Sequence, residues 1–129
     1  MAELFHNDRP TGLQIELAVG FFRRALGLLG RAGLAQDRGL WIRRCARVHT
    51  FAMRFTIDVV MVDASGRIVA LETVPPWRAG PAGAAGGDAV ELAAGSASRL
   101  GLELGDLLTV ETPCAKLQHT TPYEESIHL

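Results

Sequence analysis

An apolar run at the centre of the chain, Ile57 to Val62, constrains the fold more than any other feature. The turn-forming segment Asp63-Ala-Ser-Gly-Arg67 follows it, and a second apolar run extends from Ile68 to Val74. Two runs of strand-forming residues around such a turn predict a β-hairpin, with the glycine at the position that needs a positive φ. Pro75-Pro76 should end the second strand, because proline cannot donate a hydrogen bond to a sheet.

The rest of the chain supplies more short strands and two helices. Apolar residues at positions 13, 15 and 17 alternate with polar ones, which predicts a half-buried strand. Apolar residues at positions 19, 22, 26 and 29 then recur at helical spacing and predict a helix that ends at Gly30 or Gly33. Further strands are expected at 39–42, 89–93 and 107–111. A short helix is expected over 95–101, with Ser96 near its N-cap and Gly101 at its end.

These elements predict a single α+β domain over residues 13–111. Its strands are mostly joined by hairpin-like turns, which favours an antiparallel sheet that could curl into a partial barrel. The expected strands do not alternate with long crossover helices, so a Rossmann-type fold is disfavoured. We expect residues 1–12 to form a flexible N-terminal arm and residues 112–129, which are polar and contain two prolines, to form a C-terminal tail.

Charge and composition restrict the possible partners. The 129-residue chain has 13 basic and 14 acidic residues, a formal net charge of −1. That balance gives no long-range attraction to nucleic acid or to an anionic membrane. No aromatic motif accompanies the arginines at positions 23, 24, 31, 43, 44 and 47, so no nucleic-acid partner is expected. With two cysteines, no signal-peptide pattern and no long apolar segment, we expect a cytoplasmic protein without a membrane partner.

Several ordered motifs together resemble one family. They are Gly27-Leu-Leu-Gly-Arg31 with Leu34, Gly39-Leu40, Cys45 with Val48 to Arg54, Ile57 to Val60, Asp63 to Val69, Val90 to Gly95, Arg99 to Leu102 and Gly105-Asp106. Over about residues 13–111 the chain is similar to the bacterial and archaeal domain-of-unknown-function 192 family. The resemblance implies a compact mixed domain of short strands and no particular activity. Many relatives carry a Phe-Trp-Met-Lys-Asn-like segment where this chain has Val48 to Ala52, so a chemistry resting on Cys45 and His49 would belong to a subgroup.

Candidate functional residues cluster around the central apolar run. An ionised carboxylate at Asp58, inside an apolar strand, must be paired or hydrogen-bonded, and Arg54 lies four residues away. The first hypothesis is therefore a non-catalytic binding or accessory module with a polar cleft for an unknown small ligand or protein partner. The candidate binding residues are His49, Thr50, Phe51, Met53, Arg54, Asp58 and Glu91.

Two alternatives use Cys45. In the first, a small enzyme would use Cys45 and His49 as nucleophile and base, with Arg54 binding an anion. In the second, the spacing of four between Cys45, His49 and Met53 would place three soft ligands on one side of a helix or strand and bind Cu(I) or zinc. Because the chain shows no complete catalytic set, no P-loop and no dinucleotide fingerprint, we expect neither catalysis nor a cofactor. The sequence leaves the oligomeric state open.

Overall fold

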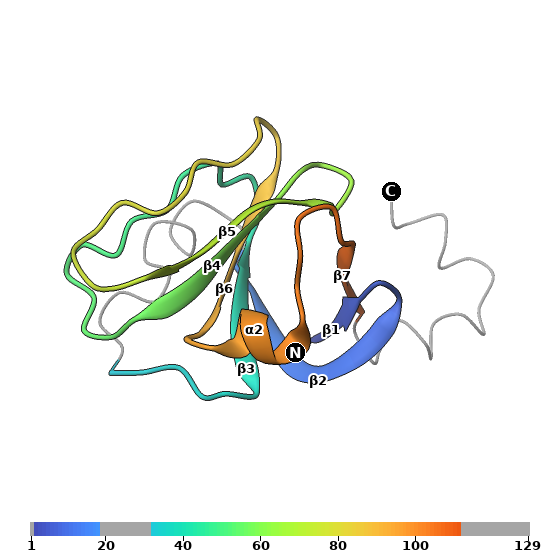
Figure 1. Ribbon diagram of the computed structural model, residues 1–129, viewed down its shortest axis with the longest axis horizontal. Helices are drawn as coiled ribbons and strands as arrows, with labels where there is room; N and C mark the ends of the chain where they lie inside the picture. Colours follow the sequence, from blue (N-terminus) through green and yellow to red (C-terminus); the bar gives the residue numbers. More distant parts are fainter. Residues whose placement is uncertain (1, 19–31, 112–129) are drawn as a thin grey trace.

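A computed structural model of the chain describes residues 2–18 and 32–111, and its elements are shown in Figure 1. In that part of the chain, seven strands form one sheet in the order β5-β4-β6-β3-β2-β1-β7. The strands are β1 (Ala2–His6), β2 (Arg9–Ala18), β3 (Arg38–Ile42), β4 (Ile57–Val62), β5 (Ile68–Val74), β6 (Asp88–Ala93) and β7 (Leu108–Glu111), and one short helix, α2 (Ser96–Leu100), lies between the last two.

Every strand pair is antiparallel except β2 with β3. The sheet is open, and its two edges approach each other at an isolated antiparallel bridge between Arg67 and Leu107. The prediction of a mostly antiparallel sheet of short strands with a short helix near residue 96 is therefore confirmed. The helix expected after residue 18 and the tail expected from residue 112 lie outside the described residues.

The N-terminal segment was predicted wrongly. Residues 2–12, expected to form a flexible arm, instead form β1 and the first part of β2, so the described sheet has one more strand than the sequence suggests. Asn7 and Asp8 both have positive φ values, 51° and 67°, as a two-residue hairpin turn requires. Pro10 is tolerated in β2 because only Gln14 to Ala18 of that strand pair with β3, so the missing N–H breaks no bond on that side.

Strand β4, second from one edge of the sheet, is buried along its whole length. Val60 and Val62 belong to one apolar cluster, with Leu4, Ile15 and Leu108, whereas Ile57, Val59 and Met61 belong to another. Neighbouring residues of a strand point to opposite faces, so the sheet has a core on each face. Val48 and Met53, from the loop between β3 and β4, pack into the second cluster and attach that loop to the sheet.

A buried carboxylate connects three of these elements. Asp58 on β4 is only 2% exposed and accepts a hydrogen bond from the Thr73 hydroxyl on β5 at 2.7 Å. It also accepts the backbone N–H groups of Gly95 at 3.1 Å and Ala97 at 2.9 Å, at the start of α2. Ser96 was predicted as the cap, but Gly95 occupies the N-cap position and has no side chain. Asp58 therefore supplies from a neighbouring strand the capping oxygen that the helix lacks.

We predict that Asp58→Ala lowers the free energy of unfolding by about 3 kcal/mol, because it leaves buried N–H donors without an acceptor. Chemical denaturation measures the loss. Glu72→Ala, an exposed acid on β5, is the matched control and should change stability by less than about 0.5 kcal/mol. An unchanged unfolding midpoint in Asp58→Ala would show that this carboxylate does not stabilise the fold.

Candidate functional site

Two loops lie side by side at one end of the sheet, at the left of Figure 1. One, residues 43–56, connects β3 to β4, and the other, residues 75–87, connects β5 to β6. They form an antiparallel ladder, with a bridge between His49 and Ala79. Backbone N–H groups donate from Gly80 to Val48 and from Gly83 to Ala46, each at 2.8 Å. We call residues 43–56 and 75–87 the paired loops.

The first of the paired loops has one buried side and one exposed side. Val48 and Thr50 are buried, whereas Arg47, His49 and Phe51 are exposed. This alternation is that of an extended segment, in which every second side chain points the same way. The buried side attaches the loop to the core, and the exposed side presents a cation and two rings in a row.

The hydroxyl of Thr50 joins the two loops from beneath. Its side chain is fully buried, and Oγ1 lies 2.5 Å from the carbonyl oxygen of Pro75, to which it donates. Oγ1 of Thr50 also accepts the backbone N–H of Arg78 at 2.9 Å. Two backbone hydrogen bonds lie beside this hydroxyl. Thr50 N–H donates to Arg78 O at 2.8 Å, and Trp77 N–H donates to Thr50 O at 2.9 Å. The segment that carries Trp77 is thus fixed against the segment that carries Phe51.

Three rings stack above this junction. The ring centroids of His49 and Phe51 are 4.9 Å apart with an interplanar angle of 25°, and those of Phe51 and Trp77 are 6.3 Å apart at 29°. Phe51 is 47% exposed and Trp77 is 65% exposed. Trp77 also holds a φ of 64°, a left-handed conformation that is unfavourable for a bulky residue. The fold therefore keeps the Trp77 ring in contact with water, which is unfavourable for an apolar ring, and does so in a strained backbone conformation.

The paired loops are also positively charged. Their exposed arginines are Arg43, Arg44, Arg47, Arg54 and Arg78, and neither loop contains an aspartate or glutamate. Asp88, just after the second loop, lies 3.6 Å from the Arg43 guanidinium and accepts from Trp41 Nε1 at 2.7 Å and from the Arg44 backbone at 2.8 Å. We define the aromatic–arginine surface as His49, Phe51 and Trp77 together with Arg47, Arg54 and Arg78.

The predicted binding residues do not line one cleft. His49, Phe51 and Arg54 are exposed on the aromatic–arginine surface, and Thr50 lies beneath it. Met53, Asp58 and Glu91 are instead buried, and Glu91 lies on β6 opposite Leu40 and Val59. The expected pairing of Asp58 with Arg54 is not formed, because the carboxylate is buried at the start of α2 and the guanidinium faces solvent.

Cys45, His49 and Met53 occupy three different environments. The half-buried Cys45 thiol donates to the carbonyl oxygen of Arg47 at 3.0 Å, Met53 is 4% exposed in the core, and His49 stacks on Phe51 in solvent. The Nδ1 atom of His49 accepts the backbone N–H of Phe51 at 3.3 Å. Residues 2–18 and 32–111 contain no group of three or more His, Cys, Asp or Glu side chains placed to hold a metal ion. The geometry thus favours neither the metal site nor a Cys45–His49 pair.

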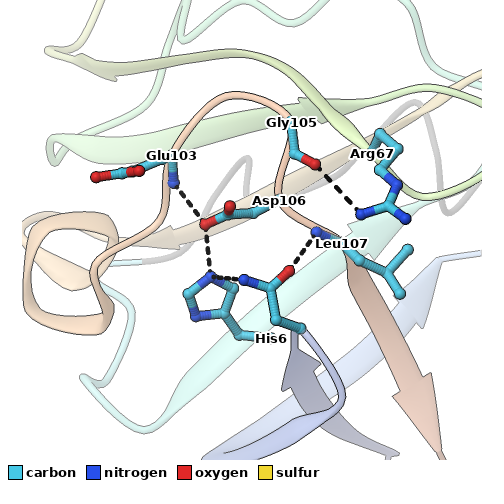
Figure 2. Close-up of polar contacts among 7 residues, drawn as sticks. His6, Arg67, Glu103, Gly105, Asp106 and Leu107 are labelled. Carbon is cyan, nitrogen blue, oxygen red and sulfur yellow. Dashed lines mark hydrogen bonds and ion pairs between the residues drawn. The ribbon is translucent and has the colours of Figure 1, made fainter.

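A second polar cluster fastens the first hairpin to the connection before β7, as Figure 2 shows. His6 Nε2 lies 2.7 Å from Asp106 Oδ2, and that oxygen also accepts the backbone N–H of Glu103 at 3.0 Å. Asn7 accepts the backbone N–H of Leu107 through Oδ1 at 2.9 Å. The hydrogen bond from His6, aided by the Glu103 N–H, holds the pKa of Asp106 below its usual 3.8. Sequence reasoning treated Asp106 only as a turn residue and missed its partner, 100 positions away.

A shallow hollow of about 370 Å³ lies elsewhere, between the start of β2 and α2. Thr11, Leu13, Asp37 and Leu100 contribute to its walls. Its one arginine, Arg99, donates to the side-chain and backbone oxygens of Gln36 at 2.6 Å and 3.1 Å. This hollow lacks the exposed rings and the cluster of exposed cations that distinguish the paired loops.

We predict that Thr50→Val lowers the free energy of unfolding by about 1–3 kcal/mol, because the backbone N–H of Arg78 and the carbonyl of Pro75 lose their hydrogen-bond partner, the hydroxyl of the buried Thr50. Hydrogen exchange at the Arg78 amide should accelerate in this variant. Thr50→Ser keeps the hydroxyl and is the control, so equal protection of Arg78 in Thr50→Val and Thr50→Ser would contradict the assigned role.

We also predict that Asp106 contributes to the acid sensitivity of the fold. Its pKa is lower in the folded than in the unfolded state, so its stabilisation is present above pH 3.8 and is lost as the pH falls through the lowered value. The melting temperature of Asp106→Asn should therefore fall less steeply below pH 3.8 than that of the natural chain. His6→Ala removes the hydrogen bond that lowers the pKa of Asp106 most, so the melting temperature of this variant should also fall less steeply. Parallel curves of melting temperature against pH for the natural chain and both variants would refute the role assigned to Asp106.

Comparisons with known proteins agree with the fold and place the chain among relatives. UPF0127 protein PH1112 of Pyrococcus horikoshii is 37% identical over 68 residues, which cover 50% of this chain and 59% of that protein. The chain thus matches about 59% of the length of this relative. None of the helices in the described part of the chain is long and apolar enough to cross a membrane.

Two solved structures share the fold. One is a protein of unknown function from Novosphingobium aromaticivorans, with a TM-score of 0.73, 22% identity, and coverage of 84% of this chain and 82% of that one. The other is described as a putative transcription regulator from Sinorhizobium meliloti, with a TM-score of 0.72, 25% identity, and coverage of 84% and 92%. A family model described as "uncharacterized ACR" matches residues 2–110, so the chain belongs to the domain-of-unknown-function 192 family.

Proposed function

We propose that the protein is a non-catalytic binding module and that the aromatic–arginine surface is its binding site. The observation that carries this proposal is the stacked row of His49, Phe51 and Trp77, exposed on loops that the buried Thr50 hydroxyl holds together. The ligand class that fits is an anion with a planar ring. Such a ligand can stack on the exposed rings while its charge is met by a guanidinium.

The position of the rings supports a binding role over a structural one. A single exposed apolar side chain is ordinary, but Phe51 and Trp77 stack on each other and are both exposed, at 47% and 65%, so they form a contiguous apolar patch. The left-handed backbone of Trp77 would suit glycine better, and strained backbone of this kind clusters at functional sites. The rigid ladder beneath the surface reduces the conformational entropy that would be lost when a ligand binds.

The enzyme and metal alternatives have less support. The thiol of Cys45 donates to the Arg47 carbonyl and His49 stacks on Phe51, so the two groups are not arranged as a nucleophile and its base. We keep the expected cytoplasmic location within this proposal, because two cysteines in 129 residues do not form the dense disulfide framework of small secreted domains.

Anilinonaphthalene sulfonate, an aromatic anion, is a suitable probe. We predict that it binds the native protein with saturable fluorescence enhancement, and that Phe51→Ala and Trp77→Gly each weaken this binding without lowering the melting temperature by more than a few degrees. Trp77→Gly suits the positive φ, so it removes the ring without adding backbone strain. Leu104→Ala is the control, because Leu104 is 66% exposed but lies in the connection before β7. Equal probe binding in all four proteins would rule out this surface.

A further inference from the structure

We infer that the ligand of the aromatic–arginine surface is single-stranded nucleic acid. This inference rests on the proposed function and names the partner of the same site. Nucleobases are planar rings that stack on aromatic side chains, and each nucleotide carries a phosphate that a guanidinium can bind in a bidentate manner. The paired loops carry both kinds of group, and a hydrogen-bonded ladder aligns one loop with the other.

The arrangement of the rings suits a strand whose bases are unpaired. The planes of His49, Phe51 and Trp77 lie within 25–29° of their neighbours, so the rings form a nearly parallel row. Phe51 is 47% exposed and Trp77, at the end of the row, is 65% exposed. Every base has a flat face, so a platform of this kind binds bases with little sequence preference.

The charges suit a polyanion in the same place. Arg47 lies two residues before His49 on the same exposed side, Arg78 follows Trp77, and Arg54 follows the turn that carries Phe51. No acidic residue lies within either loop to repel a phosphate. All three cations are arginines, whose planar guanidinium both stacks and binds phosphate.

This inference departs from the expectation, drawn from sequence, that the protein has no nucleic-acid partner. That expectation rested on the formal net charge of −1 and on the absence of an aromatic motif among the arginines. In the folded chain, Trp77 from the second loop joins Phe51 of the first, and the alternation of exposed residues places Arg47 beside His49. Duplex DNA fits less well, because the one helix within residues 2–18 and 32–111 has five residues, too few to serve as a recognition helix in a major groove.

The experiment is fluorescence anisotropy of the full chain with a labelled oligothymidylate of about 12 nucleotides, a length within the usual range of single-strand sites. We expect saturable binding. Phe51→Ala and Trp77→Gly should each weaken it about 5-fold to 150-fold, as expected for the loss of one stacked base. Leu104→Ala should bind as the natural chain does. Unchanged affinity in both ring variants would overturn the inference.

Salt dependence tests the contribution of the arginines separately. The slope of log K against log salt should be negative and should become shallower by about 0.7 for each phosphate contact that is removed. Arg47→Ala and Arg78→Ala should each show this change. Arg9→Ala should not, because this exposed arginine starts β2 at the hairpin that Figure 1 places away from the paired loops. A slope that neither Arg47→Ala nor Arg78→Ala alters would contradict phosphate binding at this surface.

Competition separates this inference from the proposed function. Unlabelled duplex of the same length, or thymidine monophosphate at equal nucleotide concentration, should compete poorly. Full competition by the duplex would refute preference for single strands, and full competition by the mononucleotide would assign the surface to free nucleotides. Saturable binding of anilinonaphthalene sulfonate without oligonucleotide binding would overturn the inference alone, whereas the absence of both would overturn the proposed function as well.

Discussion

The buried carboxylate of Asp58 is the interaction on which the arrangement of the sheet and its helix depends. A five-residue helix with glycine at its N-cap has little stability of its own, since its first N–H groups lack a local acceptor. Asp58 accepts two of those N–H groups and the Thr73 hydroxyl, and so links α2 and β5 to β4. One polar side chain inside the apolar run thus positions the elements that follow in the chain.

The same division between buried and exposed positions explains how the paired loops combine order with accessibility. Val48 and Met53 belong to the core, and Thr50 satisfies backbone groups of both loops from the buried side. The exposed positions between them are then released from any packing requirement. Side chains there are free to serve a ligand, which is how a rigid scaffold usually supports a binding loop.

Local patterns predicted much of the fold, and contacts between distant residues account for what was missed. The hairpin around Gly66 was predicted because both of its strands and its turn lie within one short segment. The first strand was missed because Pro10 and Gly12 resemble loop residues, although Asn7-Asp8 between apolar residues was a usable turn signal. Trp77 was not a candidate because 26 positions separate it from Phe51, and no spacing rule connects two loops. Asp58 was correctly expected to be satisfied, but two of its partners are backbone groups that leave no mark in the sequence, and the third is the Thr73 hydroxyl on the next strand.

The pairing of β1 with β7 has a consequence for how the protein is made. Leu4 lies opposite Val110, so the first and last described strands are neighbours, although nearly the whole described chain separates them. A ribosome releases β1 long before β7, and until then one edge of β1 can pair only with other chains. Folds built on such distant contacts form slowly, and open edges promote aggregation. The sheet can therefore be completed only after β7 has been synthesised and has left the ribosome, so the unpaired edge of β1 stays exposed until then.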